Sequence, residues 1–371
     1  MNRVEEIGIK RELLRSVMSE LGIDGLVIST QAGFSWYTAG GENRVLSATE
    51  MGAASIVVTH GIDYILTNNI EGPRVAAEAV PPQSGFQILE TPWYQAGLVG
   101  EKLSELARGK NFVADSHHWD LPPLPERIVG LSYQLMEPEV ERYRDLGRDA
   151  SFAMEGACNR AEPGMTEEEV AAVLAEEVYA RGLVPTGIMA ASDERAEQFR
   201  HPLPTEKRID HLLMLVLCAR KWGLIASLTR MLYFGRALPE ELAARHRAVQ
   251  QVDAAFILAT REGCTAEEIF NHGLTCYEAC GFRDEWQKHN QGGPTGYQGH
   301  SYVARHGETR KVLAPQAYSW NPSITGTKSM DTIITVAGGG KPELLTQAVD
   351  WPVREVEWGG ETVSRAEIMM L

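Results

Sequence analysis

Three histidines and one asparagine of this sequence have side chains suited to proton transfer and to orienting a substrate. An unperturbed imidazole titrates near pH 6.5, so His201, His289 and His300 could each accept or donate a proton at neutral pH. The amide of Asn321 could both donate and accept a hydrogen bond, as positioning a carbonyl group or a water molecule requires. Histidines also serve as packing residues, and Asn321 before Pro322 could simply form a turn. Residue type alone therefore leaves both roles open.

The segment that follows His289 is rich in glycine. Gly292 and Gly293 allow close approach of the backbone, and their N–H groups could bind an anion. No GxGxxG or GK(S/T) pattern accompanies them, which argues against a dinucleotide-binding or phosphate-binding loop. The sequence predicts a glycine-rich turn here, with His289 and Gly293 as candidates for substrate binding.

The five cysteines give weaker signals. Cys218 and Ser227 are weak nucleophile candidates, because neither has a base beside it in the sequence. Cys276 and Cys280 are four residues apart, a spacing that packing on one helical face explains better than a metal pair. An odd number of scattered cysteines favours reduced thiols, and we expect a cytoplasmic protein.

Helices and strands alternate in the first part of the chain. Apolar spacing predicts a helix over Arg3 to Leu21, and further helices are expected at 73–79 and 96–107. The predicted strands are 25–28, 54–58, 64–67 and 112–114. Prolines at 122, 123, 125 and 138 bracket a linker, so we expect an α/β domain at 1–133 and a second domain at 137–371.

The second part begins with a helix predicted at 139–161. Thr166 and Glu169 have the spacing of a capping box, and Thr265 caps a later helix that extends to Ala279. Another helix is expected at 240–261. Continuous apolar runs predict strands at 212–219 and 224–234, and two more are expected at 317–320 and 332–336.

Composition excludes two classes of partner. The net charge of −15 argues against nucleic acid, since phosphate binding needs clustered Lys and Arg. No apolar run reaches the roughly 18 residues that a membrane span requires. The first 14 residues carry charges throughout, so no signal peptide is expected.

The order of several motifs resembles that of the creatinase/aminopeptidase P/prolidase family. The resemblance covers nearly the whole chain and implies a pita-bread C-terminal domain with a smaller creatinase-type α/β domain before it. The motifs are Glu162-Pro163-Gly164-Met165-Thr166-Glu167, Arg200-His201-Pro202, Leu228-Thr229-Arg230, Gln291-Gly292-Gly293-Pro294-Thr295-Gly296, Trp320-Asn321-Pro322-Ser323 and Lys328-Ser329-Met330-Asp331-Thr332.

Peptidases of that family hold two divalent metals with two Asp, one His and two Glu, because hard cations prefer carboxylate oxygens. The resemblance places five other residues at these positions: Val216, Ser227, Gly293, Asn321 and Met330. Asp331 is the only acid within two residues of any of them. We therefore expect no catalytic metal and no other cofactor. Creatinase is a metal-free member, but the histidine that moves its proton aligns with Gly293.

The resemblance also assigns roles to the remaining polar residues. It implies that His201 and His300 face one cavity and that His201, His300 and Asn321 are catalytic. The remaining candidates for substrate contacts are Arg44, His289, Gly293, Tyr37, Arg230, Lys328 and Trp320. Arg230 could instead support the sheet, and Trp320 could instead pack in the core. The segment from Trp36 to Arg44 resembles a family loop that reaches the active site of a dimer partner, and Arg44 could clamp a carboxylate there.

These expectations lead to one preferred function and two alternatives. The preferred function is a metal-independent enzyme that acts on a C–N bond of a small nitrogen-containing carboxylic acid by histidine acid–base catalysis. The first alternative is a metal-free pseudo-peptidase that binds a ligand without turnover. The second is an Xaa-Pro aminopeptidase, which requires the five metal positions to be misaligned. A homodimer is expected in each case.

Overall fold

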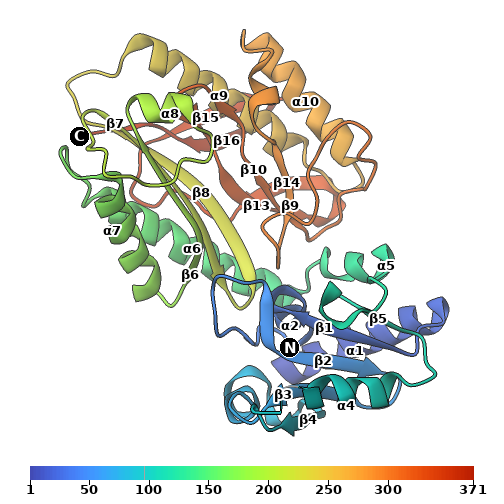
Figure 1. Cartoon of the computed structure of the whole chain (residues 1–371). Coiled ribbons are helices and arrows are strands. Elements are labelled where there is room, and N and C mark those ends of the chain that lie inside the picture. The colour runs from blue at the N-terminus through green and yellow to red at the C-terminus, as the bar shows by residue number, and fades with distance from the viewer. Residues whose placement is uncertain (96) are drawn as a thin grey trace. The chain divides into compact units, whose positions relative to one another are not determined.

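The computed structural model describes residues 1–95 and 97–371, which fall into two compact units (Figure 1). The first unit contains residues 1–132, 137–139 and 222–224, and the second contains residues 133–136, 140–221 and 225–371. Both units combine helices with sheets. The predicted α/β class is confirmed.

A five-stranded mixed sheet forms the centre of the first unit, in the order β4-β3-β2-β1-β5. The strands β1 and β5 are parallel, as are β3 and β4, whereas β2 runs antiparallel to both of its neighbours. The strands are β1 (Gly25–Thr30), β2 (Met51–Thr59), β3 (Asp63–Asn68), β4 (Phe86–Thr91) and β5 (Phe112–Ala114). Helix α4 (Gly97–Ala107) packs against β3 and buries Leu103.

Helix α1 (Arg3–Leu21) has the bounds that apolar spacing predicts. Asn2 begins it through a capping box in which its side chain accepts from the Glu5 N–H and the Glu5 carboxylate accepts from the Asn2 N–H. Gly22 ends it in the left-handed conformation, with φ of 65°, which glycine adopts without steric cost.

The predicted helix at 73–79 is a short α-helix, α3 (Gly72–Arg74), followed by a π-helical turn, η1 (Val75–Ala79). Residue 96, where another predicted helix begins, lies outside the described residues.

The segment expected to be a loop from Trp36 onward begins as a helix. Helix α2 (Gln31–Tyr37) is capped by Thr30, whose hydroxyl accepts from the Gly33 N–H at 3.1 Å. Trp36 and Tyr37 are its last residues and are buried. The loop therefore begins at Thr38, and the prediction for the two aromatic residues is corrected.

The second unit contains two successive halves with the same order of elements. Two helices precede three strands in each half, and the two main sheets have the orders β17-β8-β7-β6 and β14-β13-β10-β9. The first half contains α6 (Glu137–Cys158), α7 (Glu167–Ala180), β6 (Val184–Ser192), β7 (Leu212–Lys221) and β8 (Leu224–Tyr233). The second contains α9 (Glu240–Ala259), α10 (Ala266–Ala279), β9 (Gly292–Thr295), β10 (Ala317–Trp320) and β13 (Asp331–Val336).

Shorter elements complete the described chain. They are α5 (Glu126–Val129), α8 (Glu194–Gln198), β11 (Ser323–Ile324), β12 (Thr327–Lys328), β14 (Gly340–Leu344), β15 (Val353–Trp358), β16 (Glu361–Ala366) and β17 (Met369–Met370). The pairs β11–β12 and β15–β16 form separate two-stranded sheets, and the latter packs on α9.

The second helix of each half starts in the same way. Thr166 and Glu169 form a capping box at α7, and Thr265 and Glu268 form one at α10. Each threonine also makes an isolated antiparallel bridge, to Arg208 and Lys311 respectively. The sequence shows no repeat that is obvious by eye, so the shared order of elements becomes visible in the structure.

The predicted glycine-rich turn at 292–293 is instead strand β9. Gly292–Thr295 pairs antiparallel with β10, with Gly293 opposite Ser319 and Pro294 opposite Tyr318. Glycine and proline are poor strand formers, which is why the sequence favours a turn. Glycine is required at residue 293 by the close approach of another backbone segment. A Cβ atom there would lie 2.5 Å from the Tyr302 carbonyl oxygen.

Candidate functional site

The structure joins two of the predicted histidines, which are 88 residues apart in the sequence. Nε2 of His289, just before β9, lies 2.9 Å from Nε2 of His201, which lies between α8 and β7. The ring centroids are 4.6 Å apart. His289 is buried and His201 is exposed. The exposed member of the pair is therefore the one that could meet a substrate.

The hydrogen bonds of His289 determine the protonation pattern of this pair. Its Nδ1 lies 2.5 Å from the Asn290 carbonyl oxygen, so Nδ1 carries a proton and donates it. In a neutral His289, Nε2 is then the acceptor, and the N–H at Nε2 of His201 must be the donor. A neutral His201 is left with a lone pair at Nδ1, which is the atom that could take a proton from a substrate.

Lys328, at the end of β12, is a buried cation beside this pair. The residue is 5% exposed, and its ammonium group has no hydrogen-bond or ion-pair partner within residues 1–95 and 97–371. Burial, and to a smaller extent the charge of Arg200, lower the pKa of Lys328 to about 8. Burial and the Lys328 charge in turn lower the pKa of all three imidazoles. The pKa of His201 lies below its ordinary value, that of His289 falls to about 3 and that of His300 to about 4. All three imidazoles are thus neutral at pH 7.

His300 and Asn321 each have a buried polar atom without a partner. Within the described chain, Nδ1 of His300 and Oδ1 of Asn321 make no hydrogen bond. Asn321 is 5% exposed, and its backbone N–H donates to the Gln291 carbonyl oxygen at 3.2 Å. A buried polar atom left unpaired costs about 1–3 kcal/mol, so both atoms are available for a ligand.

The residues at the five metal positions do not fit a pair of divalent cations. Val216 and Met330 belong to one buried apolar cluster, which also contains Met214 and Met231. Ser227 has a hydroxyl that donates to the Cys218 sulfur at 3.3 Å. Across residues 1–95 and 97–371, no group of three or more His, Cys, Asp or Glu side chains could hold a metal ion. Methyl groups and a thioether supply no hard oxygen ligand.

The backbone around Gly293 leaves no room for a histidine, the ligand that family peptidases have at this position. A Cβ atom there would lie 2.5 Å from the Tyr302 carbonyl oxygen and 3.3 Å from the Ala304 nitrogen, both in the backbone. A histidine at this position would therefore displace the chain around residue 302. The backbone of this unit is packed for glycine and not for an imidazole ligand.

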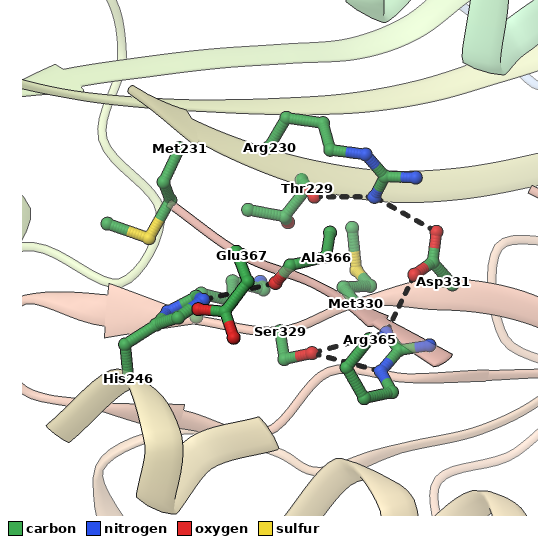
Figure 2. Close-up of a pocket in the computed structure, with 11 residues that line it drawn as sticks. Thr229, Arg230, Met231, His246, Ser329, Met330, Asp331, Arg365, Ala366 and Glu367 are labelled. Atoms are coloured by element: carbon green, nitrogen blue, oxygen red, sulfur yellow. Dashed lines mark hydrogen bonds and ion pairs between the residues drawn. The ribbon is translucent and has the colours of Figure 1, made fainter. Parts of the chain in front are cut away.

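Arg230 lies in a buried ion network rather than at an open surface. Figure 2 shows its guanidinium pointing toward Asp331, with Arg365 on the other side of that carboxylate. Arg230 donates to Asp331 at 3.1 Å, and Arg365 donates to the same carboxylate at 2.6 Å. The adjoining cavity of about 10 Å³ has room for about one water molecule. This arrangement suits a structural role for Arg230.

Three other predicted residues have contacts within their own unit. Trp320 is fully buried, stacks on Phe256 at 4.8 Å and donates from Nε1 to the Thr260 hydroxyl at 2.9 Å. In the first unit, the hydroxyl of the buried Tyr37 donates to Asp63 at 2.7 Å, and Arg44 pairs with Glu42 at 3.2 Å. In the described conformation the rings of Trp320 and Tyr37 are covered by protein.

Arg200 is a site residue that the sequence analysis did not single out. Its guanidinium donates to Glu285 at 2.6 Å and to the Thr325 hydroxyl at 3.0 Å, and its charge lowers the pKa of Lys328 and of His289. The position directly before His201 was the available signal.

The comparisons with known proteins agree with this architecture. A family model described as metallopeptidase family M24 matches residues 141–339, which is more than half of the chain. The chain belongs to metallopeptidase family M24. No protein with curated annotation matches the sequence. The M24 membership and the predicted pita-bread fold are confirmed.

Several solved structures align with nearly the whole length of this chain. An Xaa-Pro dipeptidase from Bacillus anthracis has a TM-score of 0.77 at 17% identity, over 98% of this chain and 100% of that one. A prolidase from Thermococcus sibiricus has a TM-score of 0.77 at 13% identity, over 100% of both chains. The N-terminal domain of FACT complex subunit SPT16 from Cicer arietinum has a TM-score of 0.71 at 10% identity, over 94% and 97%. At these identities the similarity shows the fold alone.

No helix within residues 1–95 and 97–371 has the length and hydrophobicity that crossing a bilayer would require.

Proposed function

We propose that this M24 member is a metal-independent enzyme that acts on a C–N bond of a small nitrogen-containing carboxylic acid. The observation that supports it is the 2.9 Å bond between His201 and His289, which leaves Nδ1 of the exposed His201 as a neutral base. The substrate class comes from the family resemblance and from the unpaired cation of Lys328. An anion is the ligand that such a cation would favour.

Proton transfer follows from the local charges. His201 takes a proton at Nδ1 from the attacking group while its Nε2–H continues to donate to His289. The resulting imidazolium is destabilised by the nearby charge of Lys328, because like charges disfavour the protonated form. It therefore returns the proton readily, and the leaving nitrogen is the group that needs one. Acid–base catalysis of this kind contributes roughly 10²–10⁴-fold to a rate.

His300 and Asn321 complete the proposed machinery. The unpaired Nδ1 of His300 and the unpaired amide oxygen of Asn321 would bind polar atoms of the substrate. No step passes through a metal ion, because the side chains at the five family positions do not fit one. A homodimer in which the Arg44 loop completes the neighbouring site belongs to the same proposal.

The test is a search for turnover of N-substituted amino acids and guanidino acids, followed by substitution. His201→Gln and His300→Gln should each lower kcat roughly 10²-fold or more. His117→Gln, which alters an exposed histidine of the first unit, should leave the rate unchanged. Full activity in the His201→Gln, His300→Gln double variant would refute the mechanism.

Metal analysis distinguishes the proposed enzyme from the alternative of an Xaa-Pro aminopeptidase. The purified chain should contain less than stoichiometric Mn, Zn and Fe, and added EDTA should leave its melting temperature unchanged. Two tightly bound ions per chain would instead establish an Xaa-Pro aminopeptidase. Tight binding of a small carboxylic acid without any turnover would support the pseudo-peptidase alternative.

A further inference from the structure

The first unit contains a cavity that the proposed C–N chemistry does not use. Its volume is about 490 Å³, and residues of β2, β3, the end of β4, the start of α4 and η3 (His117–Trp119) form its wall. Pockets that bind small molecules measure roughly 300–1,000 Å³. The cavity is therefore large enough for one small organic ligand.

Aromatic rings form part of this wall. Trp93 lines the cavity and is 60% exposed, so much of its ring is not covered by the described protein. Trp119 and His118 also line it and contact each other edge to face, with ring centroids 4.6 Å apart. Large flat side chains beside a cavity are suited to stacking on a planar ring.

A serine supplies a hydrogen-bond donor to the same cavity. The fully buried Ser29 hydroxyl accepts from Nε1 of Trp119 at 2.7 Å and lies 2.7 Å from the Ser55 hydroxyl. Within residues 1–95 and 97–371, Ser55 is the one acceptor available to the proton of the Ser29 hydroxyl. Ser29 therefore donates to Ser55, and the proton of Ser55, which lines the cavity, is left for a ligand.

An amide at the end of β3 adds a second donor. The side-chain oxygen of Asn68 accepts from the backbone N–H groups of Ile70 at 2.9 Å and Glu71 at 3.1 Å, which fixes the orientation of the amide. Its NH₂ group donates to no atom of the described chain. The hydroxyls of Thr67 and Thr91 instead donate to backbone carbonyl oxygens. The side-chain protons that remain at this wall are thus those of Ser55 and Asn68.

The composition of the wall restricts the charge of the ligand. Among residues 1–95 and 97–371, no Asp, Glu, Lys or Arg side chain lines the cavity. A charged ligand would lose part of its hydration here without gaining a countercharge. A sugar also stacks on tryptophan, but the protons of its hydroxyls need acceptors such as carboxylates. A neutral planar ring with acceptor atoms at its edge matches the wall better.

We propose that this cavity binds a neutral heteroaromatic ring of the nucleobase type. The ring packs against Trp93 and Trp119, and its carbonyl oxygens or ring nitrogens accept hydrogen bonds from Ser55 and Asn68. The inference goes beyond the proposed function, which concerns histidines of the second unit. It depends on the cavity, its aromatic wall and the two unused donors.

Titration of the full-length chain with adenine, caffeine and nicotinamide tests the inference. The indole N–H signals of nitrogen-labelled tryptophan are recorded at pH 8, where an ordinary imidazole is neutral, and Trp93→Phe identifies the signal of Trp93. We expect at least one of the three rings to shift that signal saturably, with a Kd of about 1 mM or tighter. Glucose and benzoate should give no saturable shift at the same concentrations.

Two glycine variants show whether the cavity is the site of binding. Gly100 lines the cavity, and a Cβ atom there would have no neighbour within 4 Å, so Gly100→Leu has room for a side chain that occupies the space of a ligand. Leucine also favours the helix, so the urea midpoint should not fall. Gly8→Leu is the matched control, because Gly8 lies in α1, has an equally open Cβ position and does not line the cavity.

Gly100→Leu should weaken binding about tenfold or more, whereas Gly8→Leu should bind like the wild type. Trp93→Ala shortens a largely exposed side chain and should weaken binding by a similar factor, read from the signal of Trp119. No saturable shift with any of the three rings, or equal affinity in the wild type and in either cavity variant, would overturn the inference. Binding is measured without turnover, so failure of the proposed C–N activity would not alter this result.

Discussion

At the scale of single residues, one uncompensated charge sets the chemistry of the site. Lys328 lowers the pKa of His201, His289 and His300, which are brought close to it by segments far apart in the chain. In an M24 peptidase the corresponding region would require carboxylates around cations. Here the described side chains are a lysine, three imidazoles and an amide oxygen without a hydrogen-bond partner, which is the set that the proposed proton transfer would use.

The influence of Lys328 on the histidines is directly measurable. Lys328→Met should raise the pKa of all three imidazoles, because the neighbouring positive charge is removed while burial remains. Titration by proton–nitrogen NMR of histidine-labelled protein reports each ring separately. Lys328→Arg keeps the charge and should leave the three titrations close to those of the wild type. Unchanged titrations in Lys328→Met would show that the lysine lies farther from the rings than the structure indicates.

At the scale of elements, β9 depends on a glycine that its packing demands. Gly293→Ala places a methyl group 2.5 Å from the Tyr302 carbonyl oxygen, and we expect the free energy of unfolding to fall by about 1–3 kcal/mol. Gly296→Ala is the matched control, since no atom lies within 4 Å of its Cβ position. Equal urea midpoints for the two variants would contradict the close approach.

A buried histidine connects helix α9 to two strands. His246 is 3% exposed, with Nδ1 at 2.7 Å from the Thr327 hydroxyl of β12 and Nε2 at 3.1 Å from the Ala366 carbonyl oxygen of β16. Burial lowers its pKa to about 4. Above pH 6.5 the ring is neutral in both folded and unfolded chains, so the stabilisation is complete there.

The stabilisation that His246 provides should be lost in acid. Between pH 6.5 and about 4 the unfolded chain binds a proton that the folded chain does not, so the free energy of unfolding should fall by about 3 kcal/mol from His246 alone. His289 and His300 contribute with the same sign. His246→Gln cannot titrate and should show a shallower loss in urea unfolding at pH 7 and pH 5. The exposed-site control His117→Gln should follow the wild type; an identical slope in His246→Gln would refute the assignment.

At the scale of the whole molecule, the homodimer remains a prediction. Sedimentation should give a species of twice the chain mass, and Arg44→Glu should weaken the association roughly tenfold if the loop reaches a neighbour. Arg148→Glu alters an arginine that is 59% exposed and serves as the control. A monomer at micromolar concentration would exclude a site completed by a second copy.

The sequence by itself determined many of the helices and strands and the residue types at the five family metal positions. Apolar spacing predicts α1, the spacing of Thr166 and Glu169 predicts the capping box of α7, and Thr265 is predicted as the cap of α10, because these signals are local. The five substituted metal positions are likewise a matter of residue type, visible as soon as the motifs are aligned.

Tertiary structure decided how the remaining groups meet. The bond between His201 and His289 joins residues 88 positions apart, and the isolation of Lys328 depends on which carboxylates the fold places elsewhere. Gly293 belongs to a strand because β10 supplies its hydrogen-bond partners and Tyr302 leaves no space for a side chain. Such features arise from packing between distant segments, for which local propensity contains no signal.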